Sequence, residues 1–210
     1  MLGTERPAVD RELIARPAPG RIGPNAIVRT VEALRERVGA GAAGSLLREA
    51  GLGRCGEPFP DQLVAETEVT ALFGALHRSL AENDARAVAR RAGERTADYL
   101  LAHRIPRVAQ LVLPRLPSWM ASRGLLSAMR GSAWTFAGSS EFTARDGRPA
   151  VLTFRRCPFC RDLRARAPVC DYYAGTFERL YRELVARGAR VRETACTATG
   201  GSVCVFEVRY

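Results

Sequence analysis

The sequence predicts an α+β protein in which a helical N-terminal part packs on a four-stranded antiparallel sheet, made of two hairpins joined by a helix. Apolar residues recur at helical spacing as far as Met129. After Gly131 the pattern changes to alternation around two turn signals, Asp146-Gly147 and Gly200-Gly201. Helices followed by strands are typical of the α+β class, and 210 residues are enough for one core of this kind.

The N-terminal half is expected to be helical. Residues 1–20 contain three prolines among many charges and are predicted to be a mobile arm. Residues 21–130 follow as a helical region, whose first helix begins near Asn25 and ends at Gly39 or Gly41. One face of this first helix carries its apolar residues, Ile27, Val31, Leu34 and Val38.

Further helices are expected before residue 131. A short one covers residues 45–50 and the next ends near Leu80. A long helix follows with Asn83 as its cap, and His103 falls on its apolar face. Prolines then break the chain before a last helix around 119–129.

Residues 131–210 are predicted to be the α+β segment, in one compact unit with the helical region. A first hairpin is expected over 133–156, because the Asp-Gly pair inside it accepts the positive φ angles of a tight turn. An amphipathic helix over 173–188 follows, with Gly188 as its stop. A second hairpin then turns at Gly200-Gly201.

The charge is +10, and every basic residue is arginine. Arginine suits carboxylate and phosphate ligands. The arginines are scattered among acidic residues, however, so no nucleic-acid partner is expected. There is no run of about 18 apolar residues and no signal-peptide pattern, which predicts a protein that is not transmembrane and is cytoplasmic.

Five of the six cysteines lie in the last third of the chain: Cys157, Cys160, Cys170, Cys196 and Cys204. In a chain without a secretory signal, this clustering indicates metal binding or thiol chemistry more than a disulfide framework. The pair in CPFC, Cys157 and Cys160, is a candidate zinc knuckle or redox pair. The redox interpretation is weaker, because no clear helix N-terminus follows to lower a thiolate pKa.

The segment ETACTATGGSVC holds the remaining candidates. If Gly200-Gly201 are the two turn residues, Thr197 pairs with Cys204 and the sulfurs of Cys196 and Cys204 can converge. Glu193 is three residues from Cys196, so both can bind one ion only if the strand bulges or ends between them. From spacing alone, a metal site, a disulfide and two buried thiols all remain open.

A family resemblance adds to these observations. CDYYAGTFERLYRELV and VRETACTATGGSVCVFEV resemble the 4-vinyl reductase domain, a small-molecule-binding domain related in fold to the Bet3-type subunits of vesicle-tethering complexes. With RIGPNAI, RTADYLLAHRIP and AWTFAGS, the chain from about residue 20 to 210 resembles the bacteriochlorophyll 4-vinyl (8-vinyl) reductase family. The resemblance implies a structural zinc ion held by Cys170, Glu193, Cys196 and Cys204, with Cys157 and Cys160 outside the ligand set.

The same resemblance implies a tetrapyrrole ligand of the divinyl protochlorophyllide or chlorophyllide type. His103 is a candidate axial ligand of its magnesium, and Arg104 or Arg107 could meet a propionate. Trp134 and Phe136, expected on one strand face, could line a flat aromatic pocket. The alternatives are a helix-end histidine bonded to backbone and two ordinary core aromatics.

Three functions follow from the resemblance. The family name implies an enzyme that reduces the 8-vinyl group of the tetrapyrrole, yet no GxGxxG follows a strand and no flavin motif is evident. The sequence therefore favours a carrier that binds the pigment precursor and presents it to other bacteriochlorophyll-biosynthesis enzymes. A protein-interaction module is the third possibility, and related folds suggest a homodimer.

Overall fold

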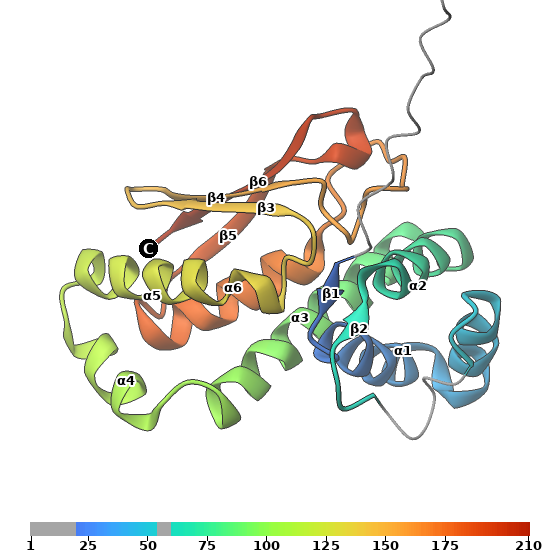
Figure 1. Ribbon diagram of the computed structural model, residues 1–210, viewed down its shortest axis with the longest axis horizontal. Helices are drawn as coiled ribbons and strands as arrows, with labels where there is room; N and C mark the ends of the chain where they lie inside the picture. The colour runs from blue at the N-terminus through green and yellow to red at the C-terminus, as the bar shows by residue number, and fades with distance from the viewer. Residues whose placement is uncertain (1–19, 54–59) are drawn as a thin grey trace, which may run out of the picture.

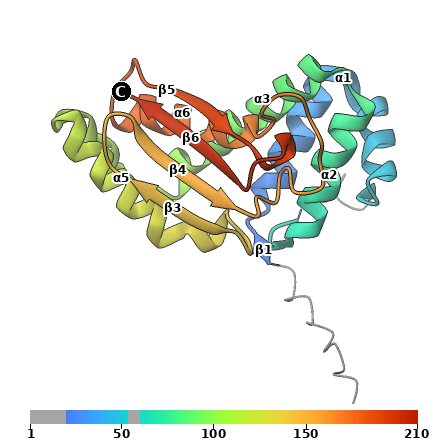
Figure 2. The ribbon, with the colours of Figure 1, turned by 90° about the horizontal axis from the view of Figure 1, so that it is seen from above.

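The computed structural model describes residues 20–53 and 60–210, so most of the predicted arm, and also Cys55, lie outside the described residues. Figure 1 shows two parts. One is a group of three helices, α1 (Asn25–Glu49), α2 (Glu66–Ser79) and α3 (Glu82–His103). The other is a sheet with α5 (Ser118–Ser132) and α6 (Asp171–Leu184) beneath it. Figure 2 shows them at opposite ends of the molecule.

Helix α1 differs slightly from its prediction. It runs to Glu49 as one element, but Gly39 has a φ of +81° and kinks it. The predicted stop and the predicted short helix are therefore one kinked helix, in which glycine adopts the left-handed conformation at low cost. The residue capping its start is Pro24. The predicted apolar face is buried at Ile27, Val31 and Leu34.

Helix α3 joins the helical group to the sheet by packing against α6. The contact is close because glycines face backbone at the crossing. A Cβ on Gly93 would lie 2.0 Å from the Tyr172 carbonyl oxygen, and one on Gly175 would lie 2.5 Å from that of Arg90. The Thr176 hydroxyl also donates a hydrogen bond to the Gly93 carbonyl at 3.1 Å. This crossing fixes the helical group against α6.

The sheet has the order β3-β4-β6-β5 and is antiparallel throughout. Its strands are β3 (Glu141–Arg145), β4 (Ala150–Arg155), β5 (Arg190–Ala195) and β6 (Val203–Arg209). Alternate residues of β4 and β6 are buried, including Phe154 and Phe206. These two rings pack with Tyr173 and Phe177 of α6, so the main core lies between the sheet and this helix.

The first hairpin begins later than predicted. Trp134 lies in a 3-10 turn, η3 (Ala133–Thr135), and the strand starts only at Glu141. Gly138 takes a φ of +60° between them, and the Ser139 N–H donates to the Glu66 carboxylate at 2.7 Å instead of to a strand. The expectation that Trp134 and Phe136 alternate on one strand face is therefore wrong.

The second hairpin has a wider connection than two glycines. Ala195 pairs with Val205, and a 3-10 turn, η4 (Thr197–Thr199), lies between the strands. The prediction that Thr197 pairs with Cys204 is therefore wrong. A bulge lies between Glu193 and Ala195.

Short elements complete the description. A two-stranded ribbon joins β1 (Arg21–Ile22) to β2 (Val64–Ala65). Between α3 and α5 lie α4 (Arg107–Val112) and the 3-10 turn η2 (Leu113–Arg115). Among the helices that the structure describes, none combines the length and the apolar character needed to cross a bilayer.

Candidate metal centre

Five buried cysteines from three separate segments meet beside the start of α6. Cys157 and Cys160 lie in the turn after β4, Cys170 is the residue that caps α6, and Cys196 and Cys204 flank the β5–β6 connection. The turn after β4 is held by Phe159, whose ring contacts Phe73 and Tyr172 at centroid distances of 4.6 and 4.5 Å. Packing thus turns both CPFC thiols towards the other three.

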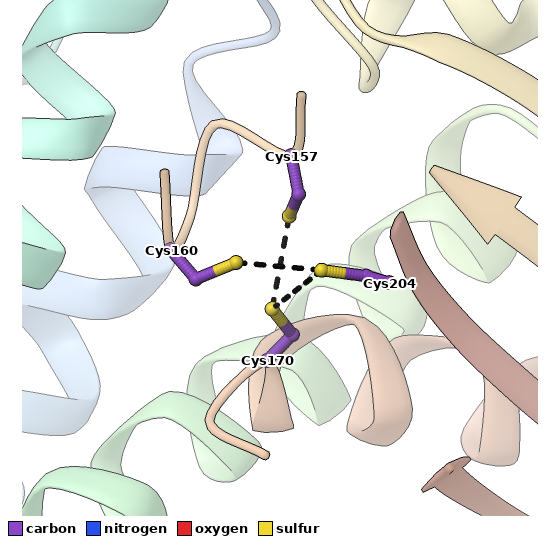
Figure 3. Close-up of side chains that lie close together, drawn as sticks. All are labelled: Cys157, Cys160, Cys170 and Cys204. Atoms are coloured by element: carbon purple, nitrogen blue, oxygen red, sulfur yellow. Dashed lines mark hydrogen bonds between the residues drawn. The ribbon is translucent and has the colours of Figure 1, made fainter. Parts of the chain in front are cut away.

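The sulfur atoms are spaced as ligands of one ion would be. Figure 3 shows Cys157 and Cys170 with sulfurs 3.7 Å apart, Cys160 and Cys204 at 3.4 Å, and Cys170 and Cys204 at 3.8 Å. Cys196 lies 3.9 Å from Cys170, 4.0 Å from Cys204 and 3.8 Å from Cys160. A zinc ion ~2.3 Å from each of four sulfurs requires sulfurs about 3.8 Å apart. All five cysteines are free thiols, so no disulfide joins any of them.

Glu193 enters the cluster through the bulge in β5. The irregular register between Glu193 and Ala195 meets the condition that the sequence set for Glu193 and Cys196 to face one point. The Cys170 backbone N–H donates to Glu193 Oε2 at 2.8 Å. Glu193 Oε1 is buried and has no hydrogen-bond partner. A buried carboxylate oxygen without a partner is costly, and a cation would satisfy it.

Two sets of four residues could hold a metal ion. Cys170, Glu193, Cys196 and Cys204 have ligand atoms within 4.8 Å of one another, and so do Cys157, Cys160, Cys170 and Cys204. The sets share Cys170 and Cys204. Sequence reasoning separated the CPFC pair from the other cysteines, although its CxxC spacing was a signal for the same cluster.

Comparison with known proteins identifies the family. Residues 150–210 match the model of the 4-vinyl reductase domain, in agreement with the C-terminal resemblance. Over 203 residues the chain is 39% identical to the bacteriochlorophyll synthase 23 kDa chain of Cereibacter sphaeroides, covering 96% of this chain and 97% of that one. The protein of the same name from Rhodobacter capsulatus is 34% identical over 197 residues, with 91% and 90% covered.

The chain belongs to the bacteriochlorophyll synthase 23 kDa chain family.

The fold of this family member is that of H-NOX proteins. A Fe(II) unliganded H-NOX protein from K. algicida matches with a TM-score of 0.59 over 90% of this chain and 96% of that chain, at 6% identity. An H-NOX protein from S. oneidensis matches with a TM-score of 0.55 at 10% identity, covering 90% of this chain and 98% of that one. The expected Bet3-type fold is therefore wrong, while the helical part and the four-stranded antiparallel sheet are as predicted. The expectation rested on the C-terminal domain, whereas the α3–α6 crossing determines the whole fold.

Burial and thiol hydrogen bonds set the protonation of the cluster in the 23 kDa chain. Burial raises the pKa of Glu193 to about 9 and also raises the pKa of Cys170. Hydrogen bonding from Cys160 lowers the pKa of Cys196 to about 6, and bonding from Cys157 lowers that of Cys204 to about 5. The metal-free cluster thus holds protons on several ligands at neutral pH, and a bound cation would displace them.

The predicted tetrapyrrole ligands are distributed over separate places. His103 is exposed, in a hollow of about 320 Å³ that Arg29 and Arg95 also line. The expectation that His103 lies on the apolar face is wrong, because the last turn of α3 extends beyond the core. Arg107 lines a neighbouring hollow of about 410 Å³, and Arg104 is exposed.

The two predicted pocket aromatics lie elsewhere in the 23 kDa chain. Trp134 is 65% exposed on η3. Phe136 packs edge-on against Phe142, at a centroid distance of 5.1 Å, and against Phe154 at 6.2 Å. Its carbonyl oxygen accepts a 2.7 Å hydrogen bond from the Tyr173 hydroxyl. Phe136 is thus part of the packing between the sheet and α6, and neither aromatic lines the hollow at His103.

Proposed function

We propose that this protein serves bacteriochlorophyll biosynthesis by binding a protochlorophyllide- or chlorophyllide-type magnesium tetrapyrrole, which it carries to the enzymes that act on it. Two relatives that match almost the whole chain are named for bacteriochlorophyll synthase, which supports a role in this pathway. A flat apolar macrocycle is poorly soluble in water, so a protein that shields it is useful without chemistry of its own.

The observation that carries the tetrapyrrole proposal is the environment of His103. Its imidazole is exposed in a hollow lined by Arg29, Arg91 and Arg95. A neutral imidazole nitrogen is a ligand for a metal ion such as the magnesium of the ring. Arginine pairs with carboxylates in bidentate geometry, so these arginines, or Arg107 in the next hollow, would hold a propionate.

Arg104, Trp134 and Phe136 have weaker support as ligand residues. Arg104 follows His103 and is exposed, so it would reach a pigment that lies over the end of α3. Trp134 is exposed but lines neither hollow, and Phe136 is committed to the core. The proposal therefore places the pigment at the end of α3.

We further propose that zinc binds at the cysteine cluster, with Cys170, Glu193, Cys196 and Cys204 as its ligands. The sulfur spacing and the unpartnered Glu193 oxygen support this set. Four protein ligands leave no open position, so the ion would be structural and would tie the β5–β6 connection to the start of α6. The all-cysteine set of Cys157, Cys160, Cys170 and Cys204 is the second candidate.

The alternative function is reduction of the 8-vinyl group, as the name of the resembling family implies. Zinc-loaded protein incubated with divinyl protochlorophyllide, with and without NADPH, distinguishes the two. The carrier predicts a shifted absorption spectrum of bound pigment and unchanged vinyl content by chromatography. Conversion to the ethyl product would show an enzyme, and neither binding nor conversion would refute the tetrapyrrole proposal and leave an interaction module.

Variants test the binding position. We expect His103→Gln to weaken pigment binding and to remove the spectral signature of axial ligation. His77, the other histidine of the chain, provides the matched variant His77→Gln. It lies on α2 with a half-buried side chain and should leave binding unchanged. Equal pigment spectra for His103→Gln and the parent protein would contradict ligation by His103.

A further inference from the structure

The stretch between Asp98 and Glu141 has an unusual charge. It contains no acidic residue and five arginines, Arg104, Arg107, Arg115, Arg123 and Arg130. All five are exposed, and none forms an ion pair with an acidic residue that the structure describes. Elsewhere arginines are commonly paired, as Arg86 is with Asp171 and Arg179 with Asp98. The segment therefore presents uncompensated positive charge.

Exposed apolar side chains are concentrated in the same stretch. Within residues 20–53 and 60–210, every large hydrophobic side chain that is exposed belongs to it: Val108, Leu111, Val112, Trp119, Met120 and Trp134. Helix α4 has no buried residue at all, and Val108, Leu111 and Val112 recur on one of its sides at helical spacing. Apolar residues gathered on a surface in this way mark an interaction site.

These features adjoin one another in the fold. Helix α4 leads through η2 into α5, which begins at Ser118 and carries Trp119 and Met120 in its first turn. Figure 1 shows α4 and the start of α5 at the end of the molecule away from α1 and α2, with α4 standing off the body. We call the residues Val108, Leu111, Val112, Trp119 and Met120, with the first four arginines of the stretch, the α4–α5 surface.

We propose that the α4–α5 surface docks onto a lipid bilayer that contains anionic headgroups. Short apolar side chains and a tryptophan can enter the interface between headgroups and acyl chains, while arginines around them pair with phosphate. Cationic side chains near such a surface each contribute about 1 kcal/mol of attraction. The surface combines both contributions, and the proposal is independent of tetrapyrrole binding.

Charge decides against a second copy of this chain as the occupant. A two-fold contact would bring the same surface together on both chains, so arginines would face arginines without a nearby carboxylate. Like charges across an interface cost several kcal/mol. An anionic surface complements the arginines instead.

The test is binding of the zinc-loaded full chain to vesicles. Co-sedimentation with vesicles of phosphatidylcholine containing phosphatidylglycerol should retain the protein, and pure phosphatidylcholine should retain far less. In a Trp134→Phe background, Trp119 is the only tryptophan, and its fluorescence should shift to shorter wavelength on binding. No binding at any phosphatidylglycerol content would overturn the proposal.

Variants locate the contact. Arg123→Gln should weaken binding about fivefold, and Leu111→Gln about tenfold, since each removes one contribution to docking. Arg192→Gln on β5 removes the same charge from an exposed site elsewhere and Leu111→Met keeps an apolar side chain, so both should bind as the parent does. Equal losses for Arg123→Gln and Arg192→Gln would show an attraction by net charge alone and refute a specific surface. A dimer in sedimentation analysis that Leu111→Gln abolishes, without vesicle binding, would equally refute it.

Discussion

The backbone N–H of Cys170 donates a 2.8 Å hydrogen bond to Glu193 Oε2, and the other carboxylate oxygen of Glu193 is buried without a partner. This bond links the cap of α6 to the bulge in β5. It also orients the free oxygen within 4.8 Å of the ligand sulfurs. The relationship makes the choice between the two candidate ligand sets testable.

Metal content should follow the set that contains Glu193. We expect Cys196→Ser and Glu193→Gln to lose most of the bound zinc, because each removes one of four ligands. Cys157→Ser, a matched change in the same cluster, should retain about one zinc per chain. Elemental analysis after desalting measures this, and loss of zinc from Cys157→Ser with retention in Glu193→Gln would instead assign the ion to the all-cysteine set.

Zinc affinity should rise with pH. Burial raises the pKa of Glu193 to about 9, so this carboxyl carries a proton at pH 7 in the metal-free protein. The pKa of Cys170 is also raised by burial, and zinc must displace both protons. Each displaced proton weakens apparent binding by about tenfold per unit of pH decrease. Chelator competition at pH 6, 7 and 8 tests this, and affinity independent of pH would contradict the protonation that we describe.

The α3–α6 crossing should be sensitive to one methyl group. Gly93→Ala places a Cβ 2.0 Å from the Tyr172 carbonyl oxygen, and backbone must move to admit it. We expect a loss of about 3 kcal/mol in the free energy of unfolding. Gly131→Ala in α5, where nothing lies within 4 Å, should be neutral or slightly stabilising. Urea denaturation compares them, and equal midpoints would show that the helices are not in close contact.

Glu66 should stabilise the protein above acidic pH. Its carboxylate is buried, and although burial opposes it, hydrogen bonds from Ser139 and the Arg161 guanidinium lower its pKa below 4.5. A carboxyl with a lowered pKa contributes stability that is present above its unfolded pKa and is lost as the pH falls through the folded value.

We therefore expect Glu66→Gln to lower the free energy of unfolding at pH 7 by about 2 kcal/mol, with a smaller deficit below pH 4. Glu141→Gln is the control, because its pair with Arg155 is exposed and contributes little. A constant deficit across the pH range would show that Glu66 acts through packing and not through its charge.

Much of the local structure could be predicted from the sequence. Helical spacing predicted α2, α3, α5 and α6, and the Asp146-Gly147 and Gly200-Gly201 signals predicted the two hairpins, because these patterns depend on neighbours along the chain. The spacing of Glu193 and Cys196 also identified the condition that β5 must bulge between them. The order of the cysteines was sufficient to name a set of metal ligands through a family resemblance.

The remaining features depend on tertiary contacts. The CPFC thiols join the cluster because Phe159 packs on Phe73, which lies in a helix far away in the sequence. Trp134 leaves the sheet because Glu66 binds Ser139, and His103 is exposed because α3 outruns the core. The overall fold depends on glycines that let α3 approach α6. Each of these outcomes arises from contacts between residues distant in sequence, and no local periodicity or spacing records them.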